Sequence, residues 1–330
     1  MDADRVLDQV RAGGLLPAGG SVVVLLSGGR DSVCLLDVAL RLTGEGGAVR
    51  AVHVNYGLRD EAADDERHCA ELCERLGVAL RVERPRRPEG GGAGNIQAWA
   101  RDVRYAAATK LALERRAADR PAVVAAGHTA DDQVETILYR LASSPSRRAL
   151  LGMRPRDGLL VRPLLGVTRA QVTAYCEQRK LPWCEDVSNG GDRYARNRVR
   201  HALVPALERI HPAAAANVLR TAALLRDEGE VLDALVGEQL DERAGRLEIP
   251  LERLAGLAPA LRRLVVQRLA DEAAGAGRLV PGAARHADEV AALRRTGRAM
   301  LDLGGGVRAV VDGGVVRVER GSGRHTGART

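Results

Sequence analysis

The stretch "SVVVLLSGGRDSVCLL", residues 21–36, places six polar or glycine residues between two apolar runs. The first run, 21–26, is short, continuous and rich in Val, which is typical of a strand buried in a parallel sheet. After the loop, apolar residues at helical spacing over 32–42 indicate a helix. A strand that leads through glycines into a helix forms an anion site, because backbone N–H groups and the positive end of the helix dipole face the loop.

Each residue type in this loop suits a bound phosphate group. Gly28 and Gly29 let the backbone approach the anion, and the hydroxyls of Ser27 and Ser32 can donate hydrogen bonds to it. Asp31 would repel phosphate unless a cation lay between them, so it predicts Mg²⁺. The loop matches neither GxxxxGK(S/T) nor GxGxxG. The alternative is an ordinary strand-to-helix turn, but the strand, loop and helix patterns together favour the anion site.

The same alternation of strand and helix continues through the first part of the chain. Strands are expected at 21–26, 49–54, 78–84 and 121–128, and helices at 32–42, 60–77, 95–119 and 130–142. This order predicts an α/β fold with a doubly wound parallel sheet. The first and fourth strands end at Ser27 and His128. Because ligands of such sheets lie beyond the carboxyl ends of the strands, the loops after these two strands are expected to line one crevice.

A different pattern follows after about residue 200. Helices are expected at 211–240, 251–273 and 283–296, followed by a hairpin over 300–320 that turns at Gly313–Gly314. Residues 321–330 are expected to form a disordered tail. We therefore predict two domains, one built on the parallel sheet over 1–205 and a smaller, mainly helical one over 206–330 that ends in the β-hairpin.

Composition narrows the function classes. A net charge of +7 favours polyanionic partners, but aromatic residues make up only 2% of the chain and Phe is absent, which argues against base stacking on an aromatic platform. The five cysteines are odd in number and scattered, so a disulfide framework is not expected. Cys69 and Cys73 are four apart and do not form a CxxC pair, which disfavours a metal site.

Nothing in the sequence points to a membrane. No apolar run approaches the length that spans a bilayer, and the first residues, "MDADRVLDQVRAGG", include acids and lack the apolar core of a secretory signal. We expect a cytoplasmic protein with no membrane partner.

The hexapeptide SGGRDS in this position resembles the PP-loop of ATP pyrophosphatases, and further motifs narrow the resemblance. They are "AVHVNYGLRDEA" (51–62), "AWARDVRYAAA" (98–108), "GHTADDQVET" (127–136), "RPLLGVTRAQVTAYCE" (162–177) and "WCEDVSNGGDRYARNRVRHALVPAL" (183–207). Together they resemble the motifs of the tRNA(Ile)-lysidine synthetase family, in order, over about residues 20–210, and faintly at 300–320.

The resemblance implies a fold, a reaction and a set of partners. The fold would be that of the PP-loop, adenine nucleotide hydrolase-like proteins. ATP with Mg²⁺ would adenylate O2 of the wobble cytidine in an isoleucine tRNA with a CAU anticodon, releasing pyrophosphate. The ε-amine of free L-lysine would then attack C2 and expel AMP, which leaves lysidine. The family also implies a homodimer and a tRNA-binding C-terminal domain.

Two acids after the fourth strand have the spacing of a cation site. Asp132 and Glu135 are three apart, so they share one helix face. Facing an ATP site, they suit either Mg²⁺ or the ammonium group of the substrate lysine. The alternative is that acids at a helix N-terminus only complement the helix dipole. His128 at the strand end favours the functional interpretation and is expected to contact the nucleotide or the adenylate.

Two arginine pairs also carry predictions. Spacing alone makes Arg101 and Arg104 a solvated surface pair, and only the family pattern makes them phosphate contacts. Arg196 and Arg200 share a helix face with Asn197 between them, which suits RNA backbone or charge that develops during transfer. An ordinary basic surface helix is the alternative.

These arguments give three sets of candidate residues. The predicted catalytic residues are Asp31, Arg104, His128, Asp132 and Arg196. The predicted nucleotide-binding residues are Ser27, Gly28, Gly29, Arg30, Asp31, Ser32, His53 and Asn55, with Asp31 also a ligand of Mg²⁺. The predicted substrate-binding residues are Arg101, Asp131, Glu135, Asn197 and Arg200. For His53 the alternative is a histidine that faces the core.

The chain departs from the family pattern in three places. Ser143–Ser146 stands where Arg-Gly-x-Gly is expected, with Arg147 or Arg148 as the candidate replacement for the arginine. Tyr56 replaces a histidine. The C-terminal part matches only the first of the two C-terminal domains of longer members, so reduced or different contacts to the tRNA acceptor stem are expected.

Three other functions compete with this interpretation. A PP-loop tRNA thiolase of the cytidine type would need CxxC pairs, which the chain lacks. A non-catalytic tRNA-binding paralogue is suggested by the altered loop at 143–146, but retention of the SGGRDS motif argues against it. A PP-loop amidotransferase acting on a small molecule would carry a glutaminase domain and would not need the basic segment at 193–201.

Overall fold

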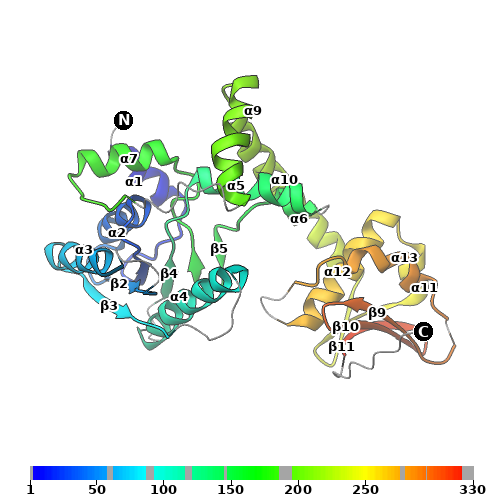
Figure 1. Ribbon diagram of the computed structural model, residues 1–330. Helices are drawn as coiled ribbons and strands as arrows, with labels where there is room; N and C mark the ends of the chain where they lie inside the picture. Colours follow the sequence, from blue (N-terminus) through cyan, green and yellow to red (C-terminus); the bar gives the residue numbers. More distant parts are fainter. Residues whose placement is uncertain are drawn as a thin grey trace. The chain divides into compact units, whose positions relative to one another are not determined.

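A computed structural model describes residues 3–57, 62–86, 93–115, 121–144, 147–185, 195–275, 279–294 and 296–321. The chain divides into two compact units, Met1–Leu225 and Arg226–Thr330. Both are drawn in Figure 1. None of the described helices is both long and apolar enough to cross a membrane.

The first unit is built on a six-stranded sheet with the order β3-β2-β1-β4-β6-β5. Its strands are β1 (Ser21–Leu25), β2 (Ala48–Val54), β3 (Ala79–Glu83), β4 (Ala122–Ala125), β5 (Arg156–Asp157) and β6 (Leu160–Val161). All neighbours pair in parallel except β5 with β6. The predicted parallel sheet is confirmed. Because the chain order reverses at β1 and β4, the rule for such sheets places a ligand beyond the carboxyl ends of these two strands.

Helices cover both faces of this sheet (Figure 1). On one face lie α1 (Ala3–Ala12), α2 (Arg30–Thr43), α3 (Ala62–Arg75) and α7 (Arg169–Gln178), and on the other lies α4 (Ala93–Arg115). Strand β4 is followed by α5 (Ala130–Ser143) and α6 (Arg147–Leu150). Successive residues of β1 point to opposite faces. Val22 and Val24 pack in the core with α2 and α7, whereas Val23 and Leu25 pack in a second core with α4. Both faces of β1 are therefore buried, as the Val-rich run predicts.

The first unit continues beyond the predicted boundary at residue 205. After α7 come α8 (Ala195–Arg198), a π-helical turn η2 (Val199–Leu203), α9 (Val204–Ile210) and α10 (Ala214–Glu238). Leu207 and Leu219 pack against Val134 and Leu138 of α5. This apolar contact holds α9 and the first half of α10 against α5. The boundary between the two units therefore falls inside α10, between 225 and 226.

The second unit contains a larger sheet than the hairpin we predict. Five antiparallel strands have the order β7-β8-β11-β10-β9. Its elements are β7 (Asp241–Arg243), β8 (Arg246–Pro250), α11 (Leu251–Gly256), α12 (Pro259–Ala274), the 3-10 helix η3 (Ala283–His286), α13 (Ala287–Ala291), β9 (Ala299–Gly304), β10 (Val307–Asp312) and β11 (Val315–Arg320). The turn at Gly313–Gly314 is confirmed, and the positive φ angles of both glycines suit a two-residue hairpin.

Proline explains why the predicted helix over 251–273 is two helices. Pro259 stands at the first turn of α12, where its missing N–H costs nothing, and the preceding Ala258 is extended. The sequence pattern does not predict β7 and β8 because these strands are short. Of the predicted tail, residues 322–330 lie outside the described residues.

A buried carboxylate ties α2 to α7. Tyr175 is fully buried, and its hydroxyl donates a hydrogen bond of 2.5 Å to Oδ2 of Asp37. Arg41 and Arg179 also donate to this oxygen, at 3.0 and 3.3 Å. These bonds compensate for the cost of burying the charge of Asp37.

Replacing Tyr175 with Phe should destabilise the first unit by about 1–3 kcal/mol, because the buried carboxylate of Asp37 then loses one donor. The two tryptophans of the chain, Trp99 and Trp183, lie in this unit, so their fluorescence follows its unfolding in urea. Tyr139→Phe is the matched control, since Tyr139 is exposed and its change should be small. Equal changes in the free energy of unfolding for the two substitutions would contradict a stabilising role of the hydrogen bond from Tyr175 to Asp37.

Candidate functional site

The loop between β1 and α2 has the geometry of an anion cradle. Gly28 has a φ of +87°, and a Cβ there would lie 3.3 Å from Sγ of Cys69, so only glycine fits. The hydroxyl of Ser32 accepts a hydrogen bond from the backbone N–H of Ser27 at 3.1 Å and donates one to the carbonyl of Gly29 at 2.8 Å. Helix α2 starts at Arg30 with no side-chain cap. The loop is therefore shaped by its own hydrogen bonds, and the helix N-terminus stays available to an anion.

Gly127, directly after β4, brings the second loop against this cradle. A Cβ on Gly127 would lie 2.9 Å from the carbonyl oxygen of Asp31 and 3.2 Å from the backbone nitrogen of Ser32. The two loops are therefore in backbone contact. Gly127 begins the motif GHTADDQVET, but the motif alone predicts no role for it.

Asp31 faces this junction with an oxygen that lacks a hydrogen bond. Its Oδ1 is buried and lies 3.6 Å from Nε of Arg30. Burial is the main cause that raises the pKa of Asp31, and the nearby charge of Asp132 adds to the shift. The structure therefore brings the predicted acids of the two loops close together.

The two carboxylate oxygens of Asp132 have different partners, one at the start of its own helix and one on Arg196. Its Oδ2 accepts hydrogen bonds from the backbone N–H of Thr129 at 2.8 Å and from the Thr129 hydroxyl at 3.0 Å, which completes a capping box. Its Oδ1 lies 3.2 Å from Nη2 of Arg196. The two roles considered for this acid from the sequence are therefore compatible, because one oxygen caps α5 and the other contacts a cation.

Glu135 lies one helical turn further and is almost completely buried, at 4% exposure. Its Oε2 accepts a hydrogen bond of 3.2 Å from Nε of Arg196. Its Oε1 lies 3.4 Å from Arg169 and 3.9 Å from Arg200. Arg196 and Arg200 share a helix face as predicted, and that face is turned toward the acids of α5. Asn197 lies between them and is half-buried.

Arg169 is a site residue that is absent from the sets predicted from the sequence. It is the first residue of α7, and its backbone N–H donates to Oδ2 of Asp131 at 2.7 Å. Its guanidinium lies 3.6 Å from Asp132 and 3.4 Å from Glu135. The sequence "GVTRAQ" does indicate where this helix begins, because Thr168 and Gln171 have the spacing of a capping box, which the structure forms. Arg169 is therefore fixed at the first position of the helix. Asp131 thus serves to position Arg169.

His128 is held neutral beside these charges. Burial is the main cause that lowers the pKa of His128 to about 4, and Asp132 acts against this shift. Its Nδ1 is buried and has no hydrogen-bond partner among the described residues. The positive charges of three arginines also lower the pKa of His128, namely Arg162, Arg196 and Arg104.

Arginines of α4, α5 and the segment after β6 form a positive group, of which Arg104 and Arg162 act on His128. Arg101 places its guanidinium 4.7 Å from the ring centre of Tyr105, and Arg104 lies 5.7 Å from the same ring. Burial lowers the pKa of Arg140 and of Arg162, and the charge of Arg101 contributes to both shifts. Arg101 and Arg104 therefore belong to a positive cluster at the crevice, which their spacing alone did not predict.

Two residues that we predict to contact the nucleotide, His53 and Asn55, make hydrogen bonds within the protein itself. Nδ1 of His53, which is buried, lies 3.0 Å from the carbonyl oxygen of Leu26. The amide of Asn55 donates to Glu66 at 2.9 Å and to the carbonyl of Ala62 at 3.2 Å. Both residues stabilise the carboxyl ends of β1 and β2, and whether they also contact a nucleotide stays a prediction.

The region of the altered loop is partly described. Ser143 and Ser144 end α5, and 145–146 lie outside the described residues. Arg147, a candidate replacement for the missing arginine, donates to the carbonyl of Leu225 in α10. Its described contact is therefore structural. Tyr56 donates a hydrogen bond of 2.6 Å to the carbonyl of Ala100, which anchors α4.

All five cysteines are described and free. Among the described residues no three His, Cys, Asp or Glu side chains are arranged to hold a metal ion. The cysteine set expected of a thiolase is therefore not formed here. A magnesium ion that is bound mainly by phosphate oxygens and one or two carboxylates does not need such a group.

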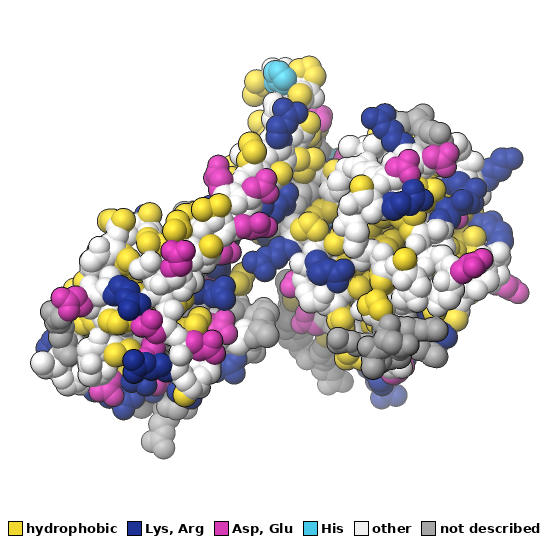
Figure 2. Space-filling view, turned by 180° about the vertical axis from the view of Figure 1, so that it is seen from behind, with side chains coloured by type: hydrophobic (Ala, Val, Ile, Leu, Met, Phe, Trp, Pro, Cys, Tyr) yellow, Lys and Arg dark blue, Asp and Glu magenta, His cyan; other side chains and the backbone are white. Residues whose placement is uncertain are grey.

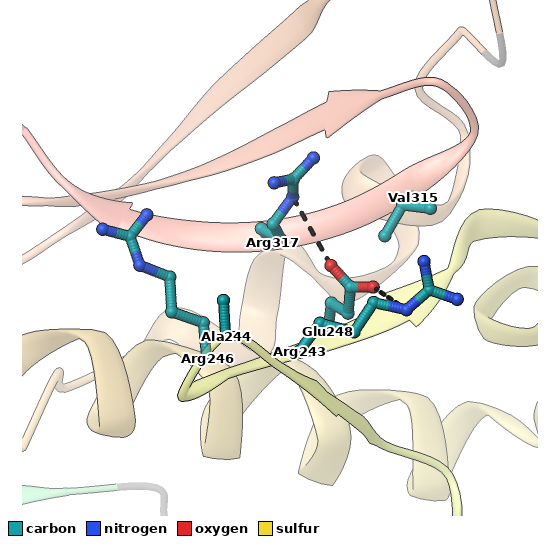
Figure 3. Close-up of a pocket in the computed structure, with 6 residues that line it drawn as sticks. All are labelled: Arg243, Ala244, Arg246, Glu248, Val315 and Arg317. Atoms are coloured by element: carbon teal, nitrogen blue, oxygen red, sulfur yellow. Dashed lines mark ion pairs between the residues drawn. The ribbon is translucent and has the colours of Figure 1, made fainter.

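The second unit carries a separate basic pocket of about 420 Å³. It is lined by Arg243, Ala244, Arg246, Glu248, Val315 and Arg317 (Figure 3). Glu248 pairs with Arg243 at 3.1 Å and with Arg317 at 3.7 Å. Residues Ile249 and Val316, next in the strands, point to the opposite face and into the core. Three arginines around one acid leave this face positive. Figure 2 shows Lys and Arg side chains on the visible face of both units.

Comparisons with known proteins agree with the fold of the first unit. A family description of PP-loop domains matches residues 5–207. A tRNA(Ile)-lysidine synthase of Thermobifida fusca is 39% identical over 306 residues, which cover 89% of this chain and 90% of the relative. One of Solibacter usitatus is 36% identical over 270 residues, or 79% of this chain, and the aligned part spans about three fifths (59%) of that relative. The U34-tRNA thiolase NcsA of Methanococcus maripaludis has a similar fold, with a TM-score of 0.56 and 17% identity over 68% of this chain and 78% of that one.

Gly127→Ala should destabilise the first unit by about 1–3 kcal/mol, because the new methyl group must push the backbone of Asp31 and Ser32 away. Urea unfolding followed by tryptophan fluorescence measures this. Unchanged stability would show that the two loops are not in contact.

His128 should make the folded state sensitive to acid. Its ordinary pKa of 6.5 falls to about 4 on folding, so between these pH values the unfolded chain binds a proton that the folded protein does not. The contribution is complete above pH 6.5 and is lost as the pH falls toward 4. The difference in unfolding free energy between wild type and His128→Asn should therefore change over this window and be constant from about pH 7 to 8.5. A difference that does not depend on pH would contradict the assignment.

Proposed function

Because the chain belongs to the tRNA(Ile)-lysidine synthase family of PP-loop proteins, we propose that it is an ATP-dependent ligase that modifies the wobble cytidine of an isoleucine tRNA with a CAU anticodon. In the first step O2 of the cytidine attacks the α-phosphorus of ATP, and pyrophosphate leaves. In the second step the ε-amine of free L-lysine attacks C2, AMP leaves with the former O2, and the amine gives up a proton. The products are lysidine, AMP and pyrophosphate.

The observation that carries this proposal is the meeting of the glycine loop with the acids of α5 at the ends of β1 and β4. The loop from Ser27 to Ser32 offers backbone N–H groups and an uncapped helix end to the phosphates of ATP. The buried Oδ1 of Asp31 has no hydrogen bond and fits a Mg²⁺ ligand beside those phosphates. When bound, Mg²⁺ would stabilise the charge of the departing pyrophosphate.

The acids of α5 fit the lysine ammonium. Asp132 and Glu135 turn three oxygens toward cationic groups that lie 3.2–3.6 Å away. Neutral His128 adds no positive charge near the incoming amine and can accept a hydrogen bond. These side chains would orient the amine toward the adenylated cytidine, which is the larger part of what such a site contributes.

The positive clusters fit the tRNA. In the first unit, Arg101 and Arg104 lie at the ring of Tyr105, and the charge of Arg104 acts on His128, so the pair suits phosphates of the anticodon loop. In the second unit, the pocket around Glu248 suits backbone phosphates elsewhere on the same molecule. Binding of tRNA by the second unit, a homodimer and a cytoplasmic location are further predictions of this proposal.

The central test uses purified protein, ATP with Mg²⁺, labelled lysine and a transcript of the CAU-anticodon isoleucine tRNA. Label should appear on the tRNA in amounts that match the AMP released. AMP release on another acceptor, with no label on the tRNA, would reject the proposal.

Asp132→Asn should lower product formation at least about a hundredfold, because the amide keeps the shape and the hydrogen bonds of the cap but loses the charge. Asp102→Asn on the exposed side of α4 is the matched control and should retain activity. An active Asp132→Asn variant would show that this carboxylate does not take part.

Arg246→Gln combined with Arg317→Gln should weaken tRNA binding and reduce the salt slope of log Kd by about one for each phosphate that the variant no longer binds. Arg268→Gln on α12, on the other side of the sheet, removes one charge without touching the pocket and should change the slope little. Equal slopes in both variants would exclude the pocket from the tRNA interface.

A further inference from the structure

The lysine-binding acids of the proposed function are already paired with an arginine of the protein itself. Nε of Arg196 donates to Oε2 of Glu135 at 3.2 Å, and its Nη2 lies 3.2 Å from both Oδ1 and the backbone oxygen of Asp132. One guanidinium thus bridges the two carboxylates. A primary ammonium that binds both acids needs the same oxygens, so it competes with Arg196.

Of the arginines that contact Asp132 and Glu135, Arg196 is the one whose guanidinium can move away from them. Its side chain is 45% exposed, whereas that of Arg169 is 18% exposed. Arg169 is also anchored by its backbone N–H, which donates to Asp131. Arg200 approaches Glu135 only to 3.9 Å and makes no hydrogen bond to it. Of the three arginines at these acids, Arg196 alone combines bridging bonds with access to solvent.

We propose that Arg196 is an internal substitute for the lysine ammonium, which closes the lysine site until tRNA phosphate draws the guanidinium away. The inference rests on the proposed function for the identity of the two ligands. Arginine forms bidentate hydrogen bonds with phosphate, so a tRNA backbone near α8 competes with the acids for it. Lysine therefore binds more tightly once tRNA is bound, because each ligand favours the same open state.

Competition sets the size of the effect. If Arg196 occupies the acids nine-tenths of the time, the apparent affinity for lysine falls about tenfold. Removing the guanidinium restores the full affinity. Bound tRNA does the same in the wild type, and by linkage lysine strengthens tRNA binding by an equal factor.

The experiment measures binding of free L-lysine by calorimetry to the full chain without ATP, with L-norleucine, which lacks the ε-amine, as the probe for non-specific binding. Arg196→Gln should bind lysine at least about tenfold more tightly than wild type when no tRNA is present. Arg196→Lys, which supplies an ammonium of its own, should stay weak. Arg200→Gln removes the same charge near Glu135 but leaves the bridge, so it should tighten binding less than Arg196→Gln does.

A second series adds the tRNA transcript. It should tighten lysine binding about tenfold in wild type and much less in Arg196→Gln.

Equal lysine affinities of wild type and Arg196→Gln overturn the inference, as does equal tightening by Arg196→Gln, Arg196→Lys and Arg200→Gln. If wild type forms lysidine, either result leaves the proposed function intact. If no variant binds lysine and no lysidine forms, both fail. Tight lysine binding by Arg196→Gln without lysidine formation supports the inference and rejects the proposed function.

Discussion

The backbone contact between Gly127 and the first turn of α2 is the constraint on which the site depends. It joins the loops that follow β1 and β4, the two strands at which the order of the sheet reverses. Any side chain at position 127 would separate them. Because the loops touch, the phosphate cradle and the acidic start of α5 form one crevice. The doubly wound sheet alone would bring both loops to the same edge but would not set their distance.

At this site each of the acids Asp31, Asp132 and Glu135 has an arginine within 3.6 Å, although Oδ1 of Asp31 makes no hydrogen bond. Burying Glu135 is costly unless its charge is paired, and three arginines from α7, α8 and η2 meet this need. The same arrangement makes the acids exchangeable between partners, because each arginine contributes only part of the stabilisation. A site in which cations can be exchanged suits a reaction whose substrate is a cation.

Local sequence chemistry predicted the loops better than their partners. The glycine loop, the acids at 131, 132 and 135, and the pair Arg196 and Arg200 could be found because each lies in one short segment with a clear spacing. Arg169 and Gly127 could not, since their roles depend on segments that are distant in sequence and meet only in the fold. His53 and Asn55 occupy the predicted strand end, but their hydrogen-bond partners are oxygens of Leu26, Ala62 and Glu66. In the second unit, β7 and β8 are too short to show a clear period. They are strands because β8 pairs with β11 and β7 pairs with β8.

The double role of Asp132 shows how such a site is held in place. A carboxylate on a flexible side chain loses conformational entropy when it binds a ligand, which weakens the binding. Here one oxygen is fixed by the Thr129 cap, so the other is already aimed at the crevice before a ligand arrives. Arg169 is fixed in the same way, through Asp131 and the capping box at the start of α7. Helix termini thus determine the positions of the acid and of its permanent cation, and the more exposed Arg196 is left as the part that can move.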